Sequence, residues 1–280
     1  MQDIQSALIE ASRILAASSD SPDLDAEILL CLILEKNRSY LRTWPKKQLH
    51  AQQRLQFKTL LKQRQQGTPI AYLTGQREFW SRDFKVSPEV LIPRPDTELL
   101  IELSLPLIPK DKSCKLIDLG TGSGAIAVTL AAERPYAQII ATDMSSAALK
   151  IAKQNADRYH CRNIRFVQSA WFSEISDTAF DLVISNPPYI AADDPHLQQG
   201  DLRFEPQSTL VADEHGLKDI SLIAESACKH LKEGGYLLIE HGYNQQPQVQ
   251  AIFESFDYAN IQTHTDLAGN PRVTMAQWHP

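Results

Sequence analysis

Apolar residues recur at intervals of three and four along the first 75 residues, the spacing that gathers side chains on one face of a helix. Ser21 and Pro22, with Asp23 and Asp25 behind them, have the composition of a helix cap and first turn. A further helical stretch, residues 49–66, stops at a Gly-Thr-Pro sequence. The pattern predicts a bundle of helices, the first of which carries its apolar residues at Ile4, Ala7, Leu8, Ala11, Ile14 and Leu15.

Short apolar runs alternate with helical stretches from residue 115 onward. This order is typical of an α/β fold with a mostly parallel, doubly wound sheet and crossover helices. A short hairpin is expected before it, with its turn at residues 81–83. We therefore expect a helical domain over residues 1–75, a β-hairpin linker over 76–93 and an α/β domain over 94–280. The strands are expected near residues 115–119, 138–142, 164–168, 180–185 and 235–240, with an antiparallel pair near 257–264 and 271–278.

Length and composition fit an intracellular enzyme. The 280 residues, 43% of them apolar and with a net charge of −6, are enough for an α/β core and a small second domain. The longest apolar run, residues 28–34, is too short to cross a bilayer, and the amino terminus lacks the features of a signal peptide. We expect a cytoplasmic protein with no membrane contact, no metal and reduced thiols, because its cysteines are scattered: Cys31, Cys114, Cys161 and Cys228.

Basic residues are concentrated in one part of the sequence. From Lys36 to Arg77 there are ten basic residues and no acidic one. A charge run usually forms a solvated helical face, and here it is also a candidate surface for docking an acidic partner. We take docking as a hypothesis for the helical domain.

A glycine-rich segment directly follows the first expected strand of the α/β domain. It reads Asp-Leu-Gly-Thr-Gly-Ser-Gly over residues 118–124, with an apolar helical stretch behind it. Alternate glycines let a backbone turn sharply and approach a ligand closely. Asp143 ends the next expected strand, a place where a carboxylate commonly binds ribose hydroxyls. Alone, the segment also satisfies a relaxed dinucleotide-binding pattern, so a nicotinamide cofactor stays open.

The sequence Asn186-Pro187-Pro188-Tyr189 ends the strand expected at 180–185, at the edge where open α/β sheets bind ligands. The Asn186 side-chain oxygen and the Pro187 carbonyl are two acceptors able to hold an NH2 group, and Tyr189 offers a face for a flat group. For a bare Asn-Pro dipeptide, a plain turn is the better interpretation. Together with the glycine segment, however, these residues resemble the S-adenosylmethionine-dependent methyltransferases that modify planar NH2 groups.

Further motifs extend the resemblance over nearly the whole chain. The glycine segment is shared by many methyltransferases, and Asn-Pro-Pro-Tyr is shared by adenine methyltransferases. The sequence Ile-Pro-Arg-Pro-Asp-Thr-Glu at residues 92–98 is more restrictive. With the pieces at 67–73 and 78–80, the chain resembles the PrmC/HemK protein-glutamine methyltransferases.

The resemblance implies N5-methylation of the glutamine in the Gly-Gly-Gln motif of class I peptide chain release factors. S-adenosylmethionine is then the methyl donor and S-adenosylhomocysteine the product, in a Rossmann-like seven-stranded domain preceded by a helix bundle and a β-hairpin. The implied cofactor-binding residues are Gly120, Thr121, Gly122, Ser123, Gly124, Asp143, Trp171 and Asn186. The implied substrate-binding residues are Asn186, Pro187, Pro188 and Tyr189, of which Asn186 and Pro187 are catalytic. For Trp171, a place in the core is the competing interpretation.

An amide nitrogen is a poor nucleophile, because its lone pair is delocalised into the carbonyl. We hypothesise that Asn186 Oδ1 and the Pro187 carbonyl accept its two N–H groups and aim the nitrogen at the methyl group. No strong general base is evident in the sequence. Asp118 is a candidate for shaping the cofactor site or for capping the next helix, and the charged residues of 92–98 are open to structural and cofactor roles.

The connection over residues 190–216 is long, and we expect it to contact the protein substrate. Class I release factors are the expected partner of an enzyme that acts as a monomer. Direct nucleic-acid binding is not expected, although the basic stretch leaves it open. The alternatives are a glutamine methyltransferase of a large-subunit ribosomal protein, an adenine-N6 nucleic-acid methyltransferase, a nicotinamide oxidoreductase and a noncatalytic adaptor.

Overall fold

The computed structural model describes residues 2–279, which divide into two compact units. The first unit comprises the residues up to Gln76 together with Gln198–Phe204, and the second comprises Arg77–Leu197 and the residues from Glu205 onward. Within residues 2–279, no helix has both the length and the apolar character needed to span a membrane.

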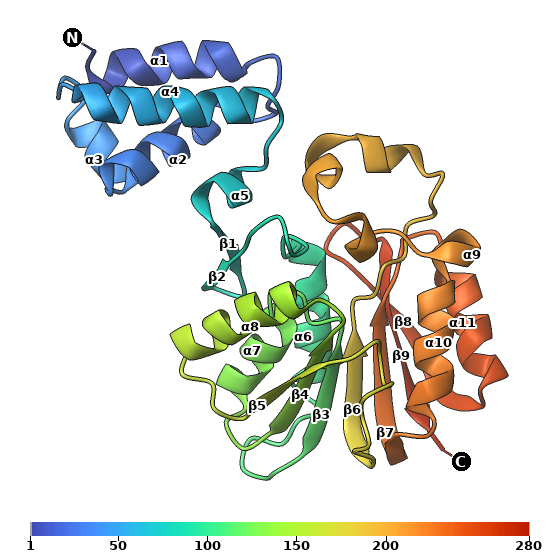
Figure 1. The fold of residues 1–280 in the computed structure, drawn as a ribbon. Helices are drawn as coiled ribbons and strands as arrows, with labels where there is room; N and C mark the ends of the chain where they lie inside the picture. Colours follow the sequence, from blue (N-terminus) through green and yellow to red (C-terminus); the bar gives the residue numbers. More distant parts are fainter. Residues whose placement is uncertain (1, 280) are drawn as a thin grey trace. The chain divides into compact units, whose positions relative to one another are not determined.

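The first unit contains a bundle of helices (Figure 1), as the apolar spacing predicts. Asp3 caps the first helix by accepting a hydrogen bond from the Ser6 amide at 2.8 Å. Pro22 begins the second helix, where an N–H group would have no partner in the helix. The helices are α1 (Ile4–Leu15), α2 (Pro22–Leu34), α3 (Arg38–Thr43), α4 (Ala51–Gln65) and α5 (Ile70–Thr74).

An ion pair lies beside the apolar core of the first unit. Arg64 Nε lies 2.7 Å from Asp25 Oδ2 and so connects α4 to α2. The same guanidinium lies 3.7 Å from Asp201, which belongs to the segment Gln198–Phe204. Around the pair, the packed side chains include Leu15, Leu29, Leu30 and Phe57.

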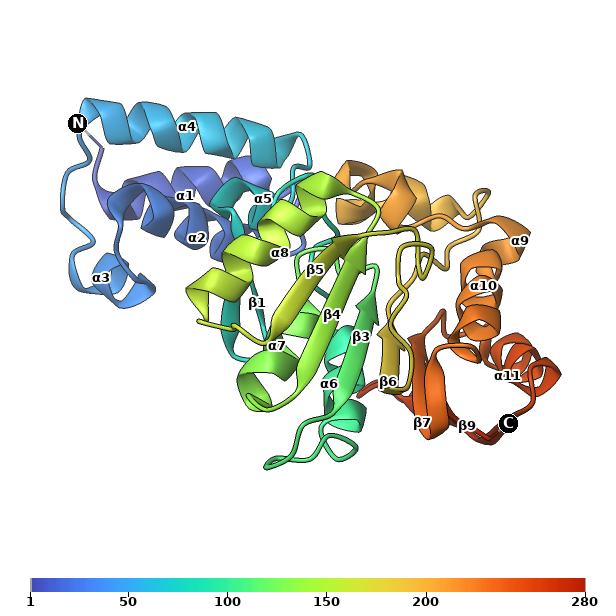
Figure 2. The ribbon, with the colours of Figure 1, turned by 60° about the horizontal axis from the view of Figure 1, so that its bottom comes forward.

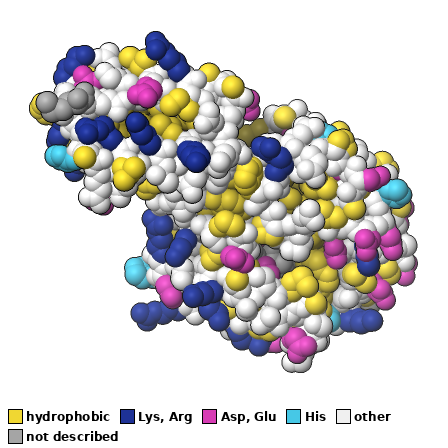
Figure 3. Space-filling view, turned by 45° about the horizontal axis from the view of Figure 1, so that its top comes forward, with side chains coloured by type: hydrophobic (Ala, Val, Ile, Leu, Met, Phe, Trp, Pro, Cys, Tyr) yellow, Lys and Arg dark blue, Asp and Glu magenta, His cyan; other side chains and the backbone are white. Residues whose placement is uncertain are grey.

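Basic side chains lie on the surface of the helical unit (Figure 3). Arg42, Lys58 and Lys62 are exposed. Arg38 is instead paired with Glu27. The basic stretch is therefore partly neutralised by local pairs and partly presented to solvent.

Two short strands follow the bundle and form a two-stranded sheet: β1 (Gln76–Phe79) and β2 (Arg82–Lys85). This hairpin is predicted by the sequence, but its turn lies at Trp80 and Ser81 rather than at 81–83. Both turn residues have positive φ, 51° and 56°, the geometry that matches the twist of the paired strands. Glu98 Oε1 accepts a hydrogen bond from the Trp80 amide at 2.8 Å and holds the turn in this shape.

The second unit contains, in the described part of the chain, a seven-stranded sheet in the order β5-β4-β3-β6-β7-β9-β8. Strands β3 to β7 pair in parallel, and β9 pairs antiparallel with β7 and β8. The predicted mostly parallel α/β sheet with a final antiparallel pair is confirmed. The strands are β3 (Lys115–Leu119), β4 (Gln138–Asp143), β5 (Ile164–Gln168), β6 (Phe180–Ser185), β7 (Leu231–Glu240), β8 (Tyr258–Thr265) and β9 (Pro271–Trp278).

Helices cover both faces of this sheet (Figure 2). Alternate residues of β3 point to opposite faces, so Leu116 packs with α6 and α7, whereas Ile117 and Leu119 pack with α10 and α11. The helices of the first face are α6 (Glu98–Ser104), α7 (Ala125–Glu133) and α8 (Ser146–Arg158). Those of the second face are α10 (Lys218–Ala227) and α11 (Gln246–Ser255).

The long connection after β6 is built from short helical turns. Ile190 pairs with Val211 in an isolated parallel bridge, which closes its base. The turns are η2 (Pro195–Gln198), η3 (Gly200–Phe204), η4 (Gln207–Thr209) and α9 (Asp213–Gly216), and a similar turn, η1 (Pro95–Thr97), precedes α6.

The strand order reverses between β3 and β6. After β3 the chain moves outward to β4 and β5, and then returns to place β6 on the other side of β3. Leu119 and Ser185 are paired at the ends of these two strands. The segments that begin at Gly120 and Asn186 therefore leave the sheet side by side, at the switch point where open α/β sheets bind ligands.

Candidate active site

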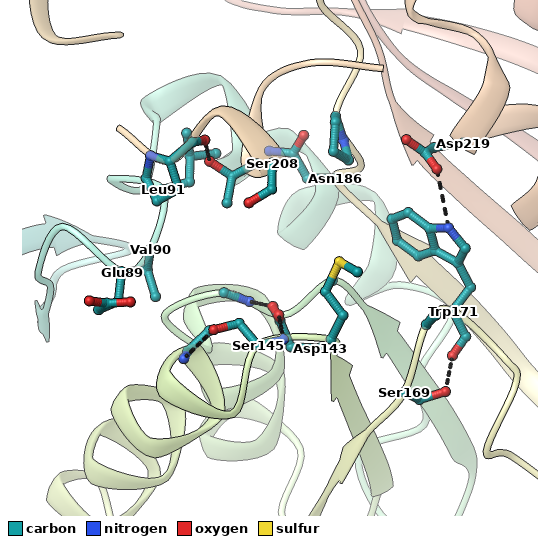
Figure 4. A pocket seen from close by; sticks show the side chains of 18 of the residues that line it. Glu89, Val90, Leu91, Asp143, Ser145, Ser169, Trp171, Asn186, Ser208 and Asp219 are labelled. Carbon is teal, nitrogen blue, oxygen red and sulfur yellow. Dashed lines mark hydrogen bonds between the residues drawn. The ribbon is translucent and has the colours of Figure 1, made fainter. Parts of the chain in front are cut away.

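A cavity of about 330 Å³ lies at the carboxyl ends of β3, β4 and β6 (Figure 4). Its volume is in the range of small-molecule sites. The residues predicted from the sequence divide into two groups. Those that line the cavity are Gly120, Gly122, Asp143, Trp171, Asn186 and Pro188. Those that do not line it are Thr121, Ser123, Gly124, Pro187 and Tyr189.

The glycine turn forms one wall of the cavity. Gly120 and Gly122 have φ values of +71° and +56°, which favour glycine. A Cβ on Gly120 would lie 3.3 Å from Cζ3 of Trp171, so the bare backbone lets the indole approach. The Thr121 amide donates to the carbonyl of Thr142 at 2.7 Å and ties the turn to β4.

Asp118 supports the turn from inside the protein. Its Oδ2 accepts hydrogen bonds from Thr121 Oγ1 at 2.6 Å and from the amide of Ala127, in the first turn of α7, at 3.2 Å. Burial raises the pKa of Asp118 to about 7. The sequence left two roles open for Asp118, shaping the cofactor site and capping the next helix. These contacts favour the helix cap.

Ser123 and Gly124 connect the turn to α8. The Ser123 carbonyl accepts a hydrogen bond from Asn155 Nδ2 at 2.8 Å. A Cβ on Gly124 would lie 3.1 Å from the Cβ of Ala152, so glycine permits the close packing of α8. Direct contact of Ser123 or Gly124 with a cofactor stays a prediction.

Asp143 lies at the end of β4 with both carboxylate oxygens in use. Oδ2 accepts from the Gly122 amide at 2.9 Å, and Oδ1 accepts from the Ser145 amide at 2.8 Å. Burial raises the pKa of Asp143, against the effect of these two bonds. Each oxygen keeps a second lone pair, so the carboxylate is able to accept further hydrogen bonds from hydroxyl groups in the cavity.

Trp171 lines the cavity and also packs against the core of the second unit. Its Nε1 donates to Asp219 Oδ1, on α10, at 3.2 Å (Figure 4). Its backbone has a positive φ of 51°, and Ser169 Oγ holds it by donating to the Trp171 carbonyl at 2.9 Å. The two interpretations from the sequence, cofactor wall and core residue, are therefore compatible.

Asn186 is held by a residue that sequence reasoning missed as a site residue. Its Nδ2 donates to Thr97 Oγ1 at 3.0 Å. Within residues 2–279, Asn186 Oδ1 and the Pro187 carbonyl receive no hydrogen bond. Ser185 Oγ donates to the Leu119 carbonyl at 2.8 Å and fixes the segment beside the glycine turn.

Tyr189 lies beside a buried acid. Its hydroxyl donates to Glu240 Oε1 at 3.2 Å. Burial raises the pKa of Glu240 to about 7, while hydrogen bonding by Thr97 and Tyr189 and the charge of Arg272 lower it. Burial also raises the pKa of Tyr189. The predicted role of its ring as a face for the substrate stays a prediction.

The charged residues of the motif at 92–98 make structural contacts. Arg94 pairs with Glu205 at 2.5 Å, and Asp96 lies 3.3 Å from Arg272. Glu98 holds the hairpin turn. None of the three lines the cavity described above, so the uncharged Thr97 is the member of the motif that reaches Asn186.

Other lining residues had no signal of their own in the sequence. Asp219 is brought to the cavity by its bond to Trp171, 48 residues earlier in the chain. In the part of the chain that the structure describes, no group of three or more His, Cys, Asp or Glu side chains is placed to hold a metal ion. The remaining unassigned lining residues include Glu89, Val90, Leu91, Met144, Ser145, Pro206, Ser208 and Thr209.

Comparison with known proteins agrees with this geometry. Residues 110–278 match the family described as methyltransferase domain, and residues 6–75 match the PrmC N-terminal domain. The release factor glutamine methyltransferase of Aliivibrio fischeri is 48% identical over 262 residues, 93% of this chain and 92% of that one. The protein of the same name from Vibrio cholerae is 50% identical over 281 residues, 98% and 96% of the two chains.

A solved structure shares the fold. The crystal structure of a methyltransferase from Pyrococcus furiosus superimposes with a TM-score of 0.54 over 72% of this chain and 91% of that one, at 17% identity. The family expected from the sequence motifs is confirmed by the curated relatives. The chain therefore belongs to the family of release factor glutamine methyltransferases.

Proposed function

We propose that this enzyme transfers a methyl group from S-adenosylmethionine to the side-chain amide nitrogen of the glutamine in the Gly-Gly-Gln motif of class I release factors. The relatives named release factor glutamine methyltransferase support this acceptor. The observation that carries the proposal at the site is a pair of uncommitted acceptors, Asn186 Oδ1 and the Pro187 carbonyl, beside the cavity. Two acceptors match the two N–H groups of a primary amide.

The cavity fits the proposed cofactor. Asp143 has the acceptors that ribose hydroxyls need, and Trp171 has a flat face for a base. Gly120 and Gly122 leave space where a Cβ would otherwise stand. When bound, S-adenosylmethionine supplies an electrophilic methyl group on a sulfonium. Thr121, Ser123 and Gly124 are proposed to bind the cofactor as parts of the same turn.

The chain's own residues position the substrate nitrogen. Asn186 Oδ1 and the Pro187 carbonyl accept its two N–H groups, which orients the nitrogen and raises its electron density as charge develops. Pro187 and Pro188 have fixed φ angles, so little freedom is lost when the loop is ordered. In ideal intramolecular cases, such positioning removes up to about 7–11 kcal/mol of a barrier.

The helical domain, residues 1–75, is proposed to dock the protein substrate. Its exposed basic side chains, which include Lys58 and Lys62, suit an acidic surface (Figure 3). The segment 190–216 contributes Pro206, Ser208 and Thr209 to the cavity and is a second proposed contact. We propose that the enzyme works as a monomer in the cytoplasm.

The proposal is tested by the position of the transferred label. The enzyme and labelled S-adenosylmethionine are incubated with a release factor, its variant lacking the Gly-Gly-Gln glutamine, a ribosomal-protein extract and DNA. Peptide mass mapping is expected to find one methyl group on the glutamine of the intact release factor. Label in a ribosomal protein or in DNA, with none in the release factor, would overturn the proposal.

Asn186→Ala removes one of the two proposed acceptors. We expect kcat to fall about 100-fold or more, as for the loss of one preorganised group that stabilises a transition state. Thermal melting is expected to show that the variant is folded. Asn260→Ala, which removes an exposed asparagine on β8, is the matched control and should keep wild-type turnover. Equal rates for Asn186→Ala and the control would refute the role of Asn186.

A further inference from the structure

The side chain of Asn186 has two ends of nearly equal size and opposite hydrogen-bonding character. Its oxygen accepts hydrogen bonds, and its nitrogen donates them. Only the oxygen is able to hold an N–H group of the substrate, and a flipped amide would set donor against donor. The proposed function therefore requires that something fixes the orientation of this amide.

Thr97 contacts the nitrogen end of the amide. Asn186 Nδ2 donates to Thr97 Oγ1 at 3.0 Å. Thr97 is 5% exposed, so solvent has little access to this contact. A hydroxyl by itself accepts or donates with equal ease, and Thr97 alone would tolerate either orientation of Asn186. The destination of the hydroxyl hydrogen therefore decides the orientation.

Glu240 is placed to receive that hydrogen. Hydrogen bonding by the Thr97 side chain lowers the pKa of Glu240, and the carboxyl group keeps an oxygen that accepts whether or not it is protonated. Glu240 is 1% exposed and lies at the end of β7, between β6 and β9 in the sheet. Its Oε1 also accepts from the hydroxyl of Tyr189, and this connects the network back to the segment that carries Asn186.

We propose, on the basis of the proposed function, that Thr97 and Glu240 are positioning residues that hold the Asn186 amide with its oxygen toward the substrate. In this network Asn186 Nδ2 donates to Thr97 Oγ1, and Thr97 Oγ1 donates to Glu240. Thr97 and Glu240 do not line the cavity, so they act on the reaction through the side chains that they hold, Asn186 first among them.

Paired substitutions of Thr97 separate this role from a general effect on folding. Thr97→Val keeps the shape of the side chain and removes its oxygen, whereas Thr97→Ser keeps the oxygen. We expect Thr97→Val to lower kcat for the release factor about tenfold or more, as for one lost buried hydrogen bond. Calorimetry should find its affinity for S-adenosylmethionine nearly unchanged. Thr97→Ser should restore most of the turnover.

A spectroscopic measurement on the wild type tests the orientation directly. The Asn186 side-chain NH2 is assigned in a ¹⁵N–¹H spectrum of the full chain, and the proton that it donates to Thr97 should exchange slowly because Thr97 is buried. In Thr97→Val the exchange should become fast. Fast exchange in the wild type would overturn the proposal even if no variant folds.

The remaining outcomes are also decisive. Wild-type kcat in Thr97→Val would overturn the proposal, and so would a parallel loss of turnover, cofactor affinity and melting temperature, because that pattern is structural. If the wild type does not methylate glutamine at all, the proposed function fails by itself. The exchange of the Asn186 amide then still reports whether Thr97 holds the nitrogen end.

Discussion

A single missing Cβ at Gly120 shapes the wall of the cavity. Gly120 has a φ of +71°, and an added Cβ would lie 3.3 Å from the ring of Trp171. The indole has little freedom to move away, because its Nε1 is bonded to Asp219. An alanine at this position would therefore strain the backbone and also displace a cavity wall.

Gly120→Ala is expected to weaken the binding of S-adenosylmethionine about tenfold or more, because the turn and the indole cannot both keep their places. Gly75→Ala is a matched control, since Gly75 also has a φ of +71° but nothing lies within 4 Å of the added Cβ. Both variants should lose similar stability from the backbone. Isothermal titration should show a loss of affinity for Gly120→Ala alone, and equal affinities would contradict this account.

At the residue scale, sequence position reveals some site residues and hides others. Gly120, Asp143 and Asn186 are predictable because each lies at the end of an apolar strand that can be identified by itself. Thr97 and Asp219 are not predictable in this way, because each reaches the site through a tertiary hydrogen bond. The partner of Thr97 is 89 residues away in the chain, and the partner of Asp219 is 48 residues away. No local pattern marks such a pair.

At the element scale, the parallel strands β3, β4 and β6 are predictable because nearly all of their residues are buried, on both faces of the sheet, and most of these are apolar. The hairpin turn is placed incorrectly, because Trp80 and Ser81 have no preference for positive φ. Their conformation is held instead by Glu98, which accepts from the Trp80 amide, and by Glu78, which accepts from the Ser81 amide at 2.6 Å. Tertiary hydrogen bonding overrides the local signal.

The segment Glu205–Thr209 contributes Pro206, Ser208 and Thr209 to the wall of the cavity, and an ion pair connects it to Arg94. The Glu205 side chain is fully buried, and Arg94, which pairs with it, is 30% exposed. Removing the guanidinium leaves a buried carboxylate without its cation and should therefore loosen the segment. Arg165 pairs with Asp177 nearer the surface, where the two side chains are 56% and 35% exposed, and such pairs contribute little.

Arg94→Gln is expected to increase the rate of limited proteolysis within residues 190–212 severalfold, because the ion pair with Glu205 is lost. Arg165→Gln removes an exposed ion pair and should leave the rate at the wild-type value. Mass spectrometry of the fragments at successive times gives both the cut sites and the rates. Identical rates for the two variants would show that the pair with Arg94 does not hold the segment.

At the scale of the whole molecule, two buried acids make stability depend on pH. Burial raises the pKa of Asp118 and of Glu240 to about 7 each. Between the ordinary carboxyl pKa and this raised value, the folded protein binds protons that the unfolded chain has released. The free energy of unfolding must therefore fall as pH rises through this window, and stay at its lower value above it.

Glu240→Gln isolates one of these contributions, because Asp118 titrates equally in both proteins and cancels. The stability of the wild type relative to Glu240→Gln should be greatest below about pH 4.5, fall as pH rises toward 7, and change by up to about 3 kcal/mol in total. The pKa of Glu240 is raised because desolvation outweighs the favourable charge of Arg272, and the charge of Asp96 raises it further. Urea unfolding at pH 5, 6, 7 and 8 measures the difference, and Glu225→Gln, on the exposed side of α10, controls for the loss of one carboxylate. A difference that stays constant with pH would show that Glu240 is ionised throughout.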